Sequence, residues 1–359
     1  MGSAPVALGL PIQSNNDPTE YPEIFKHVNN YFTQNRRFEQ GKMLGRGSFG
    51  GAFIFNELDA NGEFLRKVVV KTSLDPWSDL ATLNEIQHLT AVRGAEHIVR
   101  LLCSVPDVPG LDRAAFVMDY VEHGTWGDAL ARVRAVNQRI PNRMLWGIFL
   151  IAVARAVAGM AYPRGAEADA PPWREQIIDG QAPSLIAHND MNLGNVVVGA
   201  WDRTDEEHRL CPITKLIDFG CADTLVPGEE AGGNLAAVRS NINDIGRVMR
   251  WLISGVPDFT IAPAIIGGGD PPRTIECRTH AGLDDPGLTD ELRFLVRRCC
   301  ATNAADVPSL REVLGACENA VRNHTAQDYA HLGPAAAVYE RDAAVAYLVQ
   351  MCILDAPLS

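Results

Sequence analysis

The stretch that decides the fold is His188–Asn195, with the sequence HNDMNLGN, which is followed at once by three valines. It places a carboxylate, Asp190, and a carboxamide, Asn195, five positions apart on a turn that leads into an apolar strand. A second strand-like run, Lys215–Ile217, ends in Asp218-Phe219-Gly220. Carboxylate and carboxamide oxygens are the kind of ligand that Mg²⁺ accepts. The two stretches therefore supply one candidate base and two candidate metal ligands.

A glycine-rich segment, Gly45–Gly50 (GRGSFG), precedes this region. Glycines at this spacing let the backbone of a hairpin approach phosphate oxygens with its N–H groups. A dinucleotide-binding loop would require a helix directly after the glycines. Here 51–55 (GAFIF) follows, which predicts a strand. The segment is thus a strand–loop–strand, either a phosphate-binding hairpin or an ordinary glycine-rich hairpin tip.

A lysine and a glutamate follow the glycine-rich segment. Lys67–Lys71 (KVVVK) predicts a strand that ends in a lysine, and residues 78–93 carry apolar side chains at helical spacing. Glu85 lies on that helix, 14 residues after Lys71. A lysine at this place can also extend its amine into solvent, and Glu85 can be a solvated helix residue.

The glycine loop, the strand lysine, the helix glutamate, the H-x-D-x-x-x-x-N stretch and Asp-Phe-Gly, taken in this order, resemble the motifs of the protein-kinase fold. The resemblance covers residues 38–320. It implies an α+β, bilobal fold, with a small β-rich N-lobe that contains one key helix and a larger, mainly helical C-lobe. The implied boundaries are an N-terminal extension at 1–37, an N-lobe at 38–118, a hinge at 119–124, a C-lobe at 125–320 and a C-terminal helical tail at 321–359.

The resemblance also implies roles for single residues. Asp190 would orient and deprotonate the acceptor hydroxyl, and Lys71, held by Glu85, would bind the α- and β-phosphates of ATP. Asn195 and Asp218 would hold Mg²⁺, or Mn²⁺ in its place. Since 14 residues is a short separation for the Lys71–Glu85 pair, the lead-in to the helix must be trimmed. The nucleotide would be enclosed by Gly45, Gly47, Ser48, Phe49, Gly50, Ala52, Val69, Lys71, Met118, Asp119, Val121 and Val197.

Some residues depart from the family pattern. Asn189 stands where the family has an arginine that reads a phosphate on the activation loop, and Asn192 stands where Ser/Thr-specific kinases have a lysine. The Ala-Pro-Glu motif that closes the activation segment in the family does not occur before Asp244. Val307 stands where the family has the arginine that pairs with this motif. Losing both members of that ion pair avoids the cost of one uncompensated buried charge, about 3–5 kcal/mol. These departures predict an atypical kinase without a phosphorylation switch and with a remodelled peptide platform.

Three functions follow from the pattern. The first is transfer of the γ-phosphate of ATP to a protein Ser/Thr hydroxyl. The second is a kinase for a small molecule, because the aminoglycoside and choline kinases share the H-x-D-x-N-x-x-N pattern and lack a peptide platform. The third is a nucleotide-binding scaffold without catalysis, a pseudokinase. Asp244 resembles the family's brace of the catalytic loop, although it can also be a charge favoured at a helix N-terminus.

Composition narrows the possible partners. The chain has 359 residues, is 47% hydrophobic and carries a net charge of −12, which indicates a globular protein and argues against nucleic acid as a partner. None of its 8 cysteines falls in a CxxC pair, which predicts reduced thiols in a cytoplasmic or nuclear protein. The longest apolar run, Leu145–Tyr162, contains Arg155, so we expect a buried helix and no membrane span.

The remaining pattern predicts the other elements. We expect helices at 22–32, 126–136, 143–162, 242–252, 290–300, 308–321 and 335–353, and strands at 97–102, 115–122 and 184–187. We expect surface loops at 163–182 and 255–270. A further insert is expected at 199–212, and its polar part, 201–209, is expected to form a hairpin tip.

Overall fold

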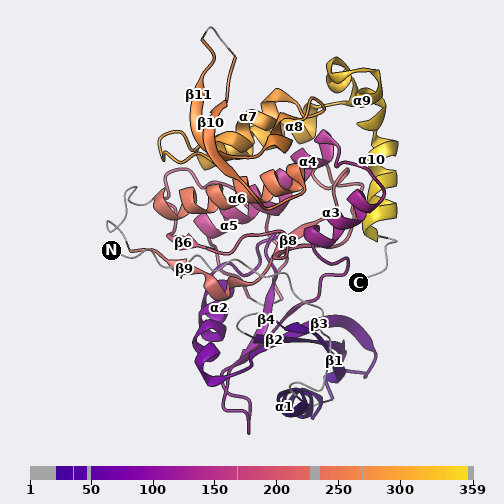
Figure 1. The fold of residues 1–359 in the computed structure, drawn as a ribbon. Helices are drawn as coiled ribbons and strands as arrows, with labels where there is room; N and C mark the ends of the chain where they lie inside the picture. Colours follow the sequence, from indigo (N-terminus) through magenta and orange to yellow (C-terminus); the bar gives the residue numbers. More distant parts are fainter. Residues whose placement is uncertain are drawn as a thin grey trace. The chain divides into compact units, whose positions relative to one another are not determined.

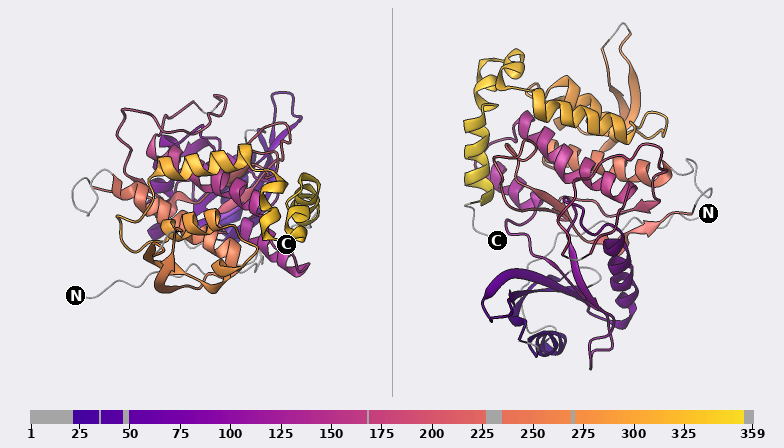
Figure 2. Two further views of the ribbon diagram at one scale, coloured as in Figure 1. Left: turned by 90° about the horizontal axis from the view of Figure 1, so that it is seen from above. Right: turned by 180° about the vertical axis from the view of Figure 1, so that it is seen from behind.

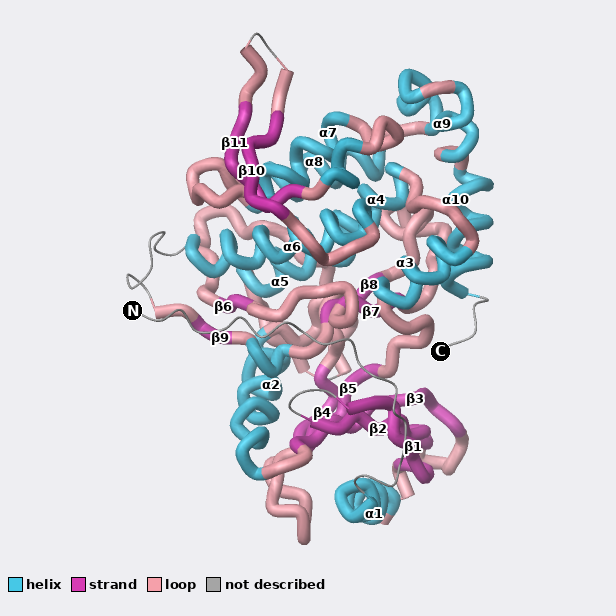
Figure 3. Tube along the Cα trace, in the orientation of Figure 1, coloured by secondary structure: helices cyan, strands magenta, loops and turns pink. Residues whose placement is uncertain are grey.

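The computed structural model describes residues 22–34, 36–46, 50–167, 169–226, 235–268 and 271–354. Over these residues the chain is an α+β protein, in which helices and small antiparallel sheets are joined by long loops (Figure 3). The chain divides into two units, and each is described by itself. Unit 1 comprises Met1–Ile86 and Leu101–Tyr120, and unit 2 comprises Gln87–Arg100 and Val121–Ser359.

Unit 1 is built on a curled, five-stranded antiparallel sheet with the strand order β1-β2-β3-β5-β4 (Figure 1). Buried and half-buried residues alternate along β2, as expected for a strand with only one face in the core. The strands are β1 (Phe38–Arg46), β2 (Gly50–Leu58), β3 (Phe64–Ser73), β4 (Leu101–Val105) and β5 (Ala115–Asp119).

Helix α1 (Pro22–Thr33) packs on this sheet, so the helix predicted at 22–32 is confirmed. Val28 and Phe32 are buried in the same core as the strand residues. The ring of Phe32 lies 5.6 Å from that of Phe38 and 5.8 Å from that of Phe55, measured between centroids. The segment predicted as an N-terminal extension therefore contributes apolar side chains to the core of unit 1.

The centre of unit 2 is the continuous helical run Asn142–Ala161, which comprises α4, a π-helical stretch and α5. Among the described residues, this run is the one helix long and apolar enough to cross a membrane by length and composition, and its apolar stretch is buried within the protein, as in the core helix of a globular domain. The helices of unit 2 are α3 (Trp126–Ala135), α4 (Asn142–Ile148), α5 (Ala156–Ala161), α6 (Ala236–Ser254), α7 (Asp290–Cys299), α8 (Leu310–Asn323), α9 (Pro334–Tyr339) and α10 (Asp342–Val349).

Three two-stranded sheets complete unit 2. Two of them, β6–β9 and β7–β8, hold the segments that carry the predicted catalytic residues. The third, β10–β11, is a hairpin that projects from the helices of unit 2 on the side opposite α10 (Figure 2). The strands are β6 (Ile186–Ala187), β7 (Val196–Val198), β8 (Thr214–Leu216), β9 (Asp223–Thr224), β10 (Thr260–Ile265) and β11 (Thr274–Thr279).

The predictions for 255–270 and 335–353 are wrong. The loop predicted at 255–270 contains β10, because its threonine and isoleucine residues find a partner in β11, which lies outside the predicted segment. The single helix predicted at 335–353 is two helices, α9 and α10. The chain breaks between them because the buried carboxylate of Glu340 accepts hydrogen bonds from the backbone N–H groups of Asn142 and Arg143.

The strand predicted at 97–102 is also wrong in its first part, since β4 begins only at Leu101. Residues 97–100 belong to unit 2, where Val99 donates its N–H to the carbonyl of Leu216 and Ile98 forms an isolated bridge to the same residue. The backbone N–H of His97 is bound by the carboxylate of Glu175. The partners of this segment are therefore loops and strands that come much later in the chain.

The two predicted inserts are less exposed than expected. The segment 163–182 is a loop without a helical turn over its described residues, but Glu175 within it is fully buried. The polar stretch 201–209 connects β7 to β8, as a hairpin tip would, yet its Glu207 and His208 are buried. Both inserts thus add charged groups to the interior of unit 2.

Candidate functional site

Within unit 1 the structure brings Lys71 and Glu85 together. Lys71 lies on β3, opposite Ala52 of β2 and Phe116 of β5. Its Nζ is 2.7 Å from Oε2 of Glu85, and the two side chains are 13% and 2% exposed. An ion pair this far from solvent holds the lysine amine in a fixed position, because either partner alone would be a costly buried charge.

The short separation between these residues is accommodated by the way α2 (Asp79–Ala91) begins. A single 3₁₀ turn, Pro76–Ser78, connects β3 to α2, and the carboxylate of Asp75 accepts hydrogen bonds from its backbone. The carboxylate of Asp79 then accepts hydrogen bonds from Ser73 Oγ at 3.1 Å and from the N–H of Ala114 at 3.0 Å. These bonds fix the first turn of α2 to the sheet. The short connection between β3 and α2 is therefore sufficient.

The glycine-rich segment joins β1 to β2, and Gly45 pairs with Ala52. Gly47, Ser48 and Phe49, predicted to contact the nucleotide, lie outside the described residues. A Cβ on Gly50 would lie 2.6 Å from the carbonyl oxygen of Thr72, whereas a Cβ on Gly45 would meet no atom within 4 Å. Gly50 is therefore required by the close approach of β3, independently of any ligand.

The other predicted nucleotide contacts fall in both units. In unit 1, Val69 of β3 pairs with Met118 of β5, and both are buried. The carboxylate of Asp119 lies 3.4 Å from Nη1 of Arg66. Val121 and Val197 belong to unit 2, where buried Val197 lies on β7.

In unit 2 the segment His188–Asn195 forms a turn whose hydrogen bonds converge on Asp190. Nδ2 of Asn195 donates to Oδ2 of Asp190 at 2.9 Å and to its carbonyl oxygen at 2.8 Å. Nδ2 of Asn192 donates to Oδ1 of Asp190 at 3.2 Å, while its own Oδ1 accepts from the N–H of Gly194 at 2.8 Å. Each carboxylate oxygen of Asp190 is thus held by one side-chain amide.

The start of this turn is fixed by a histidine. His188 Nε2 lies 3.1 Å from the carbonyl oxygen of Ile217, and its Nδ1 lies 3.3 Å from the N–H of Asp190. The backbone N–H of His188 donates to Oδ1 of Asn241 on α6 at 3.0 Å. A single neutral tautomer, protonated on Nε2, satisfies both ring contacts. The turn is therefore tied to the end of β8 and to α6.

Asp218 directly follows this end of β8 and has a left-handed backbone, with φ 64° and ψ 72°. Such a conformation is unfavourable for a non-glycine residue and marks a position that its surroundings impose. The next residue, Phe219, is fully buried with its ring edge-on to His188, 4.7 Å between centroids. Burial raises the pKa of the Asp190 carboxyl, and the negative charge of Asp218 raises it further.

These residues have the chemistry of a base beside a cation site. The donor set of Asn195 and Asp218, a carboxamide and a carboxylate oxygen, suits Mg²⁺. Because the amide nitrogen of Asn195 is directed at Asp190, its oxygen is the atom left to bind a cation. Asp190 is partly buried and hydrogen-bonded, which suits a proton acceptor held in one orientation.

Two residues that support the site lay outside the predicted set. Asn192 was identified only as a departure from the family pattern, yet its amide holds Asp190. Asn241 connects two parts of the loop, because its Nδ2 also donates to the carbonyl of Ile186 at 2.9 Å. An asparagine on the buried side of a helix is the signal that could have identified this role. Asp244, three residues later on α6, is buried and interacts with the backbone N–H of Met191.

The charge state of Asp244 gives a testable pH dependence. Burial raises the pKa of its carboxyl to about 6, although Arg247, 2.7 Å away, acts in the opposite direction. The ordinary value is 3.8, so the folded chain binds this proton more tightly than the unfolded chain. The contribution of this group to the free energy of unfolding therefore falls as pH rises from about 4 to about 6.

We expect Asp244→Asn to remove this pH dependence, because the amide does not titrate. The free energy of unfolding of the wild type minus that of the variant should fall by up to about 3 kcal/mol between pH 4 and pH 6. Urea unfolding at a series of pH values measures the difference. Parallel profiles for the two proteins would contradict the assignment of the raised pKa to Asp244.

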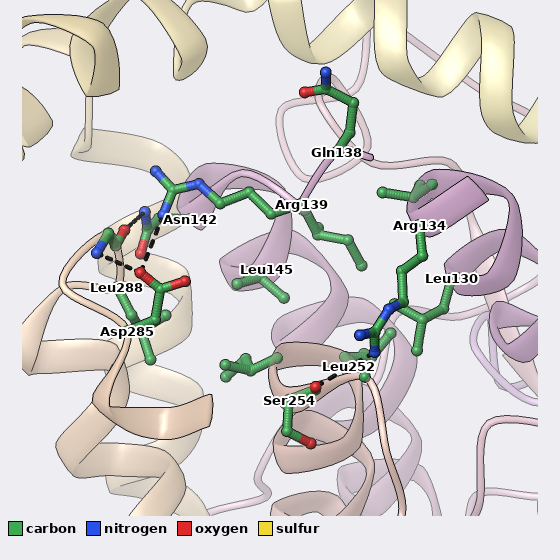
Figure 4. Close-up of a pocket in the computed structure, with 15 residues that line it drawn as sticks. Leu130, Arg134, Gln138, Arg139, Asn142, Leu145, Leu252, Ser254, Asp285 and Leu288 are labelled. Atoms are coloured by element: carbon green, nitrogen blue, oxygen red, sulfur yellow. Dashed lines mark hydrogen bonds and ion pairs between the residues drawn. The ribbon is translucent and has the colours of Figure 1, made fainter. Parts of the chain in front are cut away.

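A separate cavity of about 150 Å³ lies in unit 2 (Figure 4). Leu130, Leu145 and Leu252 supply apolar walls, and Arg134 closes one side by donating to the carbonyl of Ser254 at 3.3 Å. The residues that line it include none of the predicted site residues. The cavity is therefore distinct from the turn that holds Asp190.

Comparison with protein-family models and with curated proteins finds no match to this chain.

Proposed function

We propose that this protein is an ATP- and Mg²⁺-dependent phosphotransferase with a bilobal protein-kinase-like fold, which transfers the γ-phosphate of ATP to a Ser/Thr hydroxyl of a protein. The observation that supports this most is the state of Asp190. Its carboxylate is held by the amides of Asn192 and Asn195, and the charge of Asp218 raises its pKa. A carboxylate oriented by neutral donors beside a second carboxylate suits a base next to a cation.

In this proposal each residue acts by position and charge. Asp190 accepts the proton of the acceptor hydroxyl as its oxygen bonds to the γ-phosphorus and the bond to the β-phosphate oxygen breaks. Asn195 and Asp218 would hold Mg²⁺, which would supply positive charge to neutralise the phosphates. Lys71, fixed by Glu85, binds the α- and β-phosphates. Phosphoryl transfer requires positioning and charge neutralisation more than covalent participation by the protein.

A small-molecule acceptor is the second candidate, and the position of α6 favours it. Only residues 219–235 separate Asp218 from the start of this helix, so little chain is left for a surface that docks a peptide. In addition, Asn192 replaces a cation that protein kinases place near the γ-phosphate. Both features suit a small acceptor molecule, which would be held by a few direct contacts and not by a peptide-docking surface.

The first test is a transfer assay with γ-labelled ATP and Mg²⁺ or Mn²⁺, using generic protein acceptors, the chain itself and a panel of small hydroxyl compounds. Label on protein supports the protein kinase, and label on a small compound supports the second candidate. Binding of nucleotide without any transfer would favour a scaffold. Failure to bind or turn over ATP would overturn the proposal.

A substitution at Lys71 tests the proposed nucleotide site more directly than the transfer assay does. We expect Lys71→Met to weaken MgATP binding by about 10- to 100-fold, because a charge-assisted hydrogen bond to phosphate contributes about 1.5–3 kcal/mol. Isothermal titration calorimetry measures the affinity, and circular dichroism confirms that the variant is folded.

The matched control is Lys67→Met on the same strand. Lys67 is exposed, with its amine 5.7 Å from the ring of Tyr120, and carries no proposed role. Its loss should leave the affinity for MgATP unchanged. Equal effects of the two substitutions would show that Lys71 contributes only to the general charge of β3.

A further inference from the structure

A second cluster of polar side chains lies in unit 2, apart from the proposed catalytic residues. Glu96, His97 and His208 each direct one oxygen or nitrogen atom to a common point, and these atoms lie within 4.8 Å of one another. His97 and His208 are buried, with their ring centroids 5.4 Å apart. Glu96 and His97 come from the turn between α2 and β4, and His208 comes from the polar insert between β7 and β8.

Three of the four imidazole nitrogens of His97 and His208 have no hydrogen-bond partner among the described residues. Nδ1 of His97 lies 2.6 Å from Oε2 of Glu175, but its Nε2 has no partner, and neither has either nitrogen of His208. A buried imidazole nitrogen that makes no hydrogen bond has lost its contacts with water without replacing them. This desolvation costs about 1–3 kcal/mol for each nitrogen. His97 and His208 therefore each leave an unsatisfied ring nitrogen in a cluster whose ligand atoms lie within 4.8 Å of one another, which a bound ligand could satisfy.

The groups around the cluster resemble the supports of a metal site. The carboxylate of Glu175 holds His97 on the ring nitrogen opposite to the one that faces the cluster, as carboxylates do behind metal-binding histidines. Nε of Arg174 lies 2.9 Å from Glu96, and its Nη2 lies 2.7 Å from Asp205. The carboxylates of Glu96 and Glu175 thus lie beside the two imidazoles, and a divalent cation would compensate their negative charge.

We propose that Glu96, His97 and His208 bind a divalent transition-metal ion, and that this ion is Zn²⁺. Two imidazoles and one carboxylate are a donor set that zinc accepts, with one position left for water. Zinc–ligand bonds of about 2.0–2.2 Å place neighbouring ligand atoms roughly 3.4 Å apart, so the side chains would close by about 1 Å on binding. The ion would tie the insert that carries His208 to the segment 96–97. This site does not depend on the proposed kinase activity.

The test is titration of the full, chelator-treated chain with Zn²⁺ by calorimetry, and with Co²⁺ followed by its visible absorption. We expect one bound equivalent of Zn²⁺ with a Kd of about 1 µM or below. His208→Ala should lose this equivalent. His331→Ala, which removes an exposed histidine, should keep it. Asp218→Ala should also keep it, which separates this site from the proposed Mg²⁺ site.

A second variant guards against a folding defect in His208→Ala. Glu175→Gln keeps all three ligands and removes only the carboxylate behind His97, so it should retain one equivalent with an affinity about 10- to 100-fold weaker. The proposal is overturned if the wild type takes up no Zn²⁺. It is equally overturned if neither His208→Ala nor Glu175→Gln changes the uptake, because the metal would then be bound elsewhere.

Discussion

Asp190→Asn is expected to lower the rate of phosphoryl transfer by about 10²–10⁴-fold, the usual contribution of a positioned general base. The substitution keeps the size of the side chain and replaces a proton acceptor with a group that cannot accept a proton. The hydrogen bonds from Asn195 to the backbone carbonyl of residue 190, and from Asn192 to the same oxygen, remain possible. The turn should therefore keep its shape while the chemical step is lost.

The measurement is the single-turnover rate with γ-labelled ATP, compared with MgATP affinity determined separately. If Asp190 is the base, the rate falls and the affinity changes little, since no phosphate contact is removed. Asp223→Asn is the matched control, because Asp223 is an exposed carboxylate on β9, next to the same segment. A variant at Asp190 that transfers phosphate at the wild-type rate would exclude the proposed mechanism.

The parts of the site that the sequence predicts are those with local signals. The run of three valines located β3, and the helical spacing of apolar residues located α2, so that Lys71 and Glu85 were placed on the correct elements. The turn at 188–195 is likewise built from residues near in sequence, since Asn192 and Asn195 bind Asp190 within five positions. The pairing of Lys71 with Glu85, however, was implied by the family resemblance, and the bond from Asn192 to Asp190 was not predicted.

The parts that the sequence did not predict depend on partners far along the chain. His97 is bound by Glu175, 78 residues later, and this bond removes the segment 97–100 from the expected strand. The break between α9 and α10 depends on Glu340 binding Asn142, 198 residues earlier. Polar inserts are normally assigned to the surface, because charged residues are seldom buried without a partner. Here the partners exist, but no short-range pattern reveals them.

A third set of long-range contacts that the sequence did not predict is made by Arg155. This residue lies in the π-helical stretch between α4 and α5, and its side chain is only 5% exposed. Its Nη2 is 2.6 Å from Glu207 and 2.7 Å from Glu318, and its Nη1 donates to the carbonyl of Glu175 at 2.7 Å. One guanidinium thus joins the core helix to both inserts and to α8. These contacts hold residues of both inserts against the core helix.

Arg155→Met is therefore expected to destabilise unit 2 by about 3–5 kcal/mol, the usual cost of leaving one member of a buried ion pair without its partner. Glu207, 2% exposed, would then keep only the more distant contacts with Arg174 at 3.8 Å and Arg322 at 3.6 Å. The measurement is urea unfolding followed by far-UV circular dichroism. Arg311→Met is the matched control, because Arg311 and its partner Asp179 are 66% and 84% exposed. Its loss should cost no more than about 1 kcal/mol.

A double variant separates the charge from the packing. In Arg155→Met with Glu207→Leu, both charges of the closest pair are replaced by apolar side chains, so the penalty for the lone carboxylate disappears. The double variant should be more stable than Arg155→Met alone, which would show that the inserts are held by charge compensation. If instead the two losses add, the guanidinium and the carboxylate act independently, and the inward folding of the inserts depends on other contacts, such as those of Arg174 with Glu96 and Asp205.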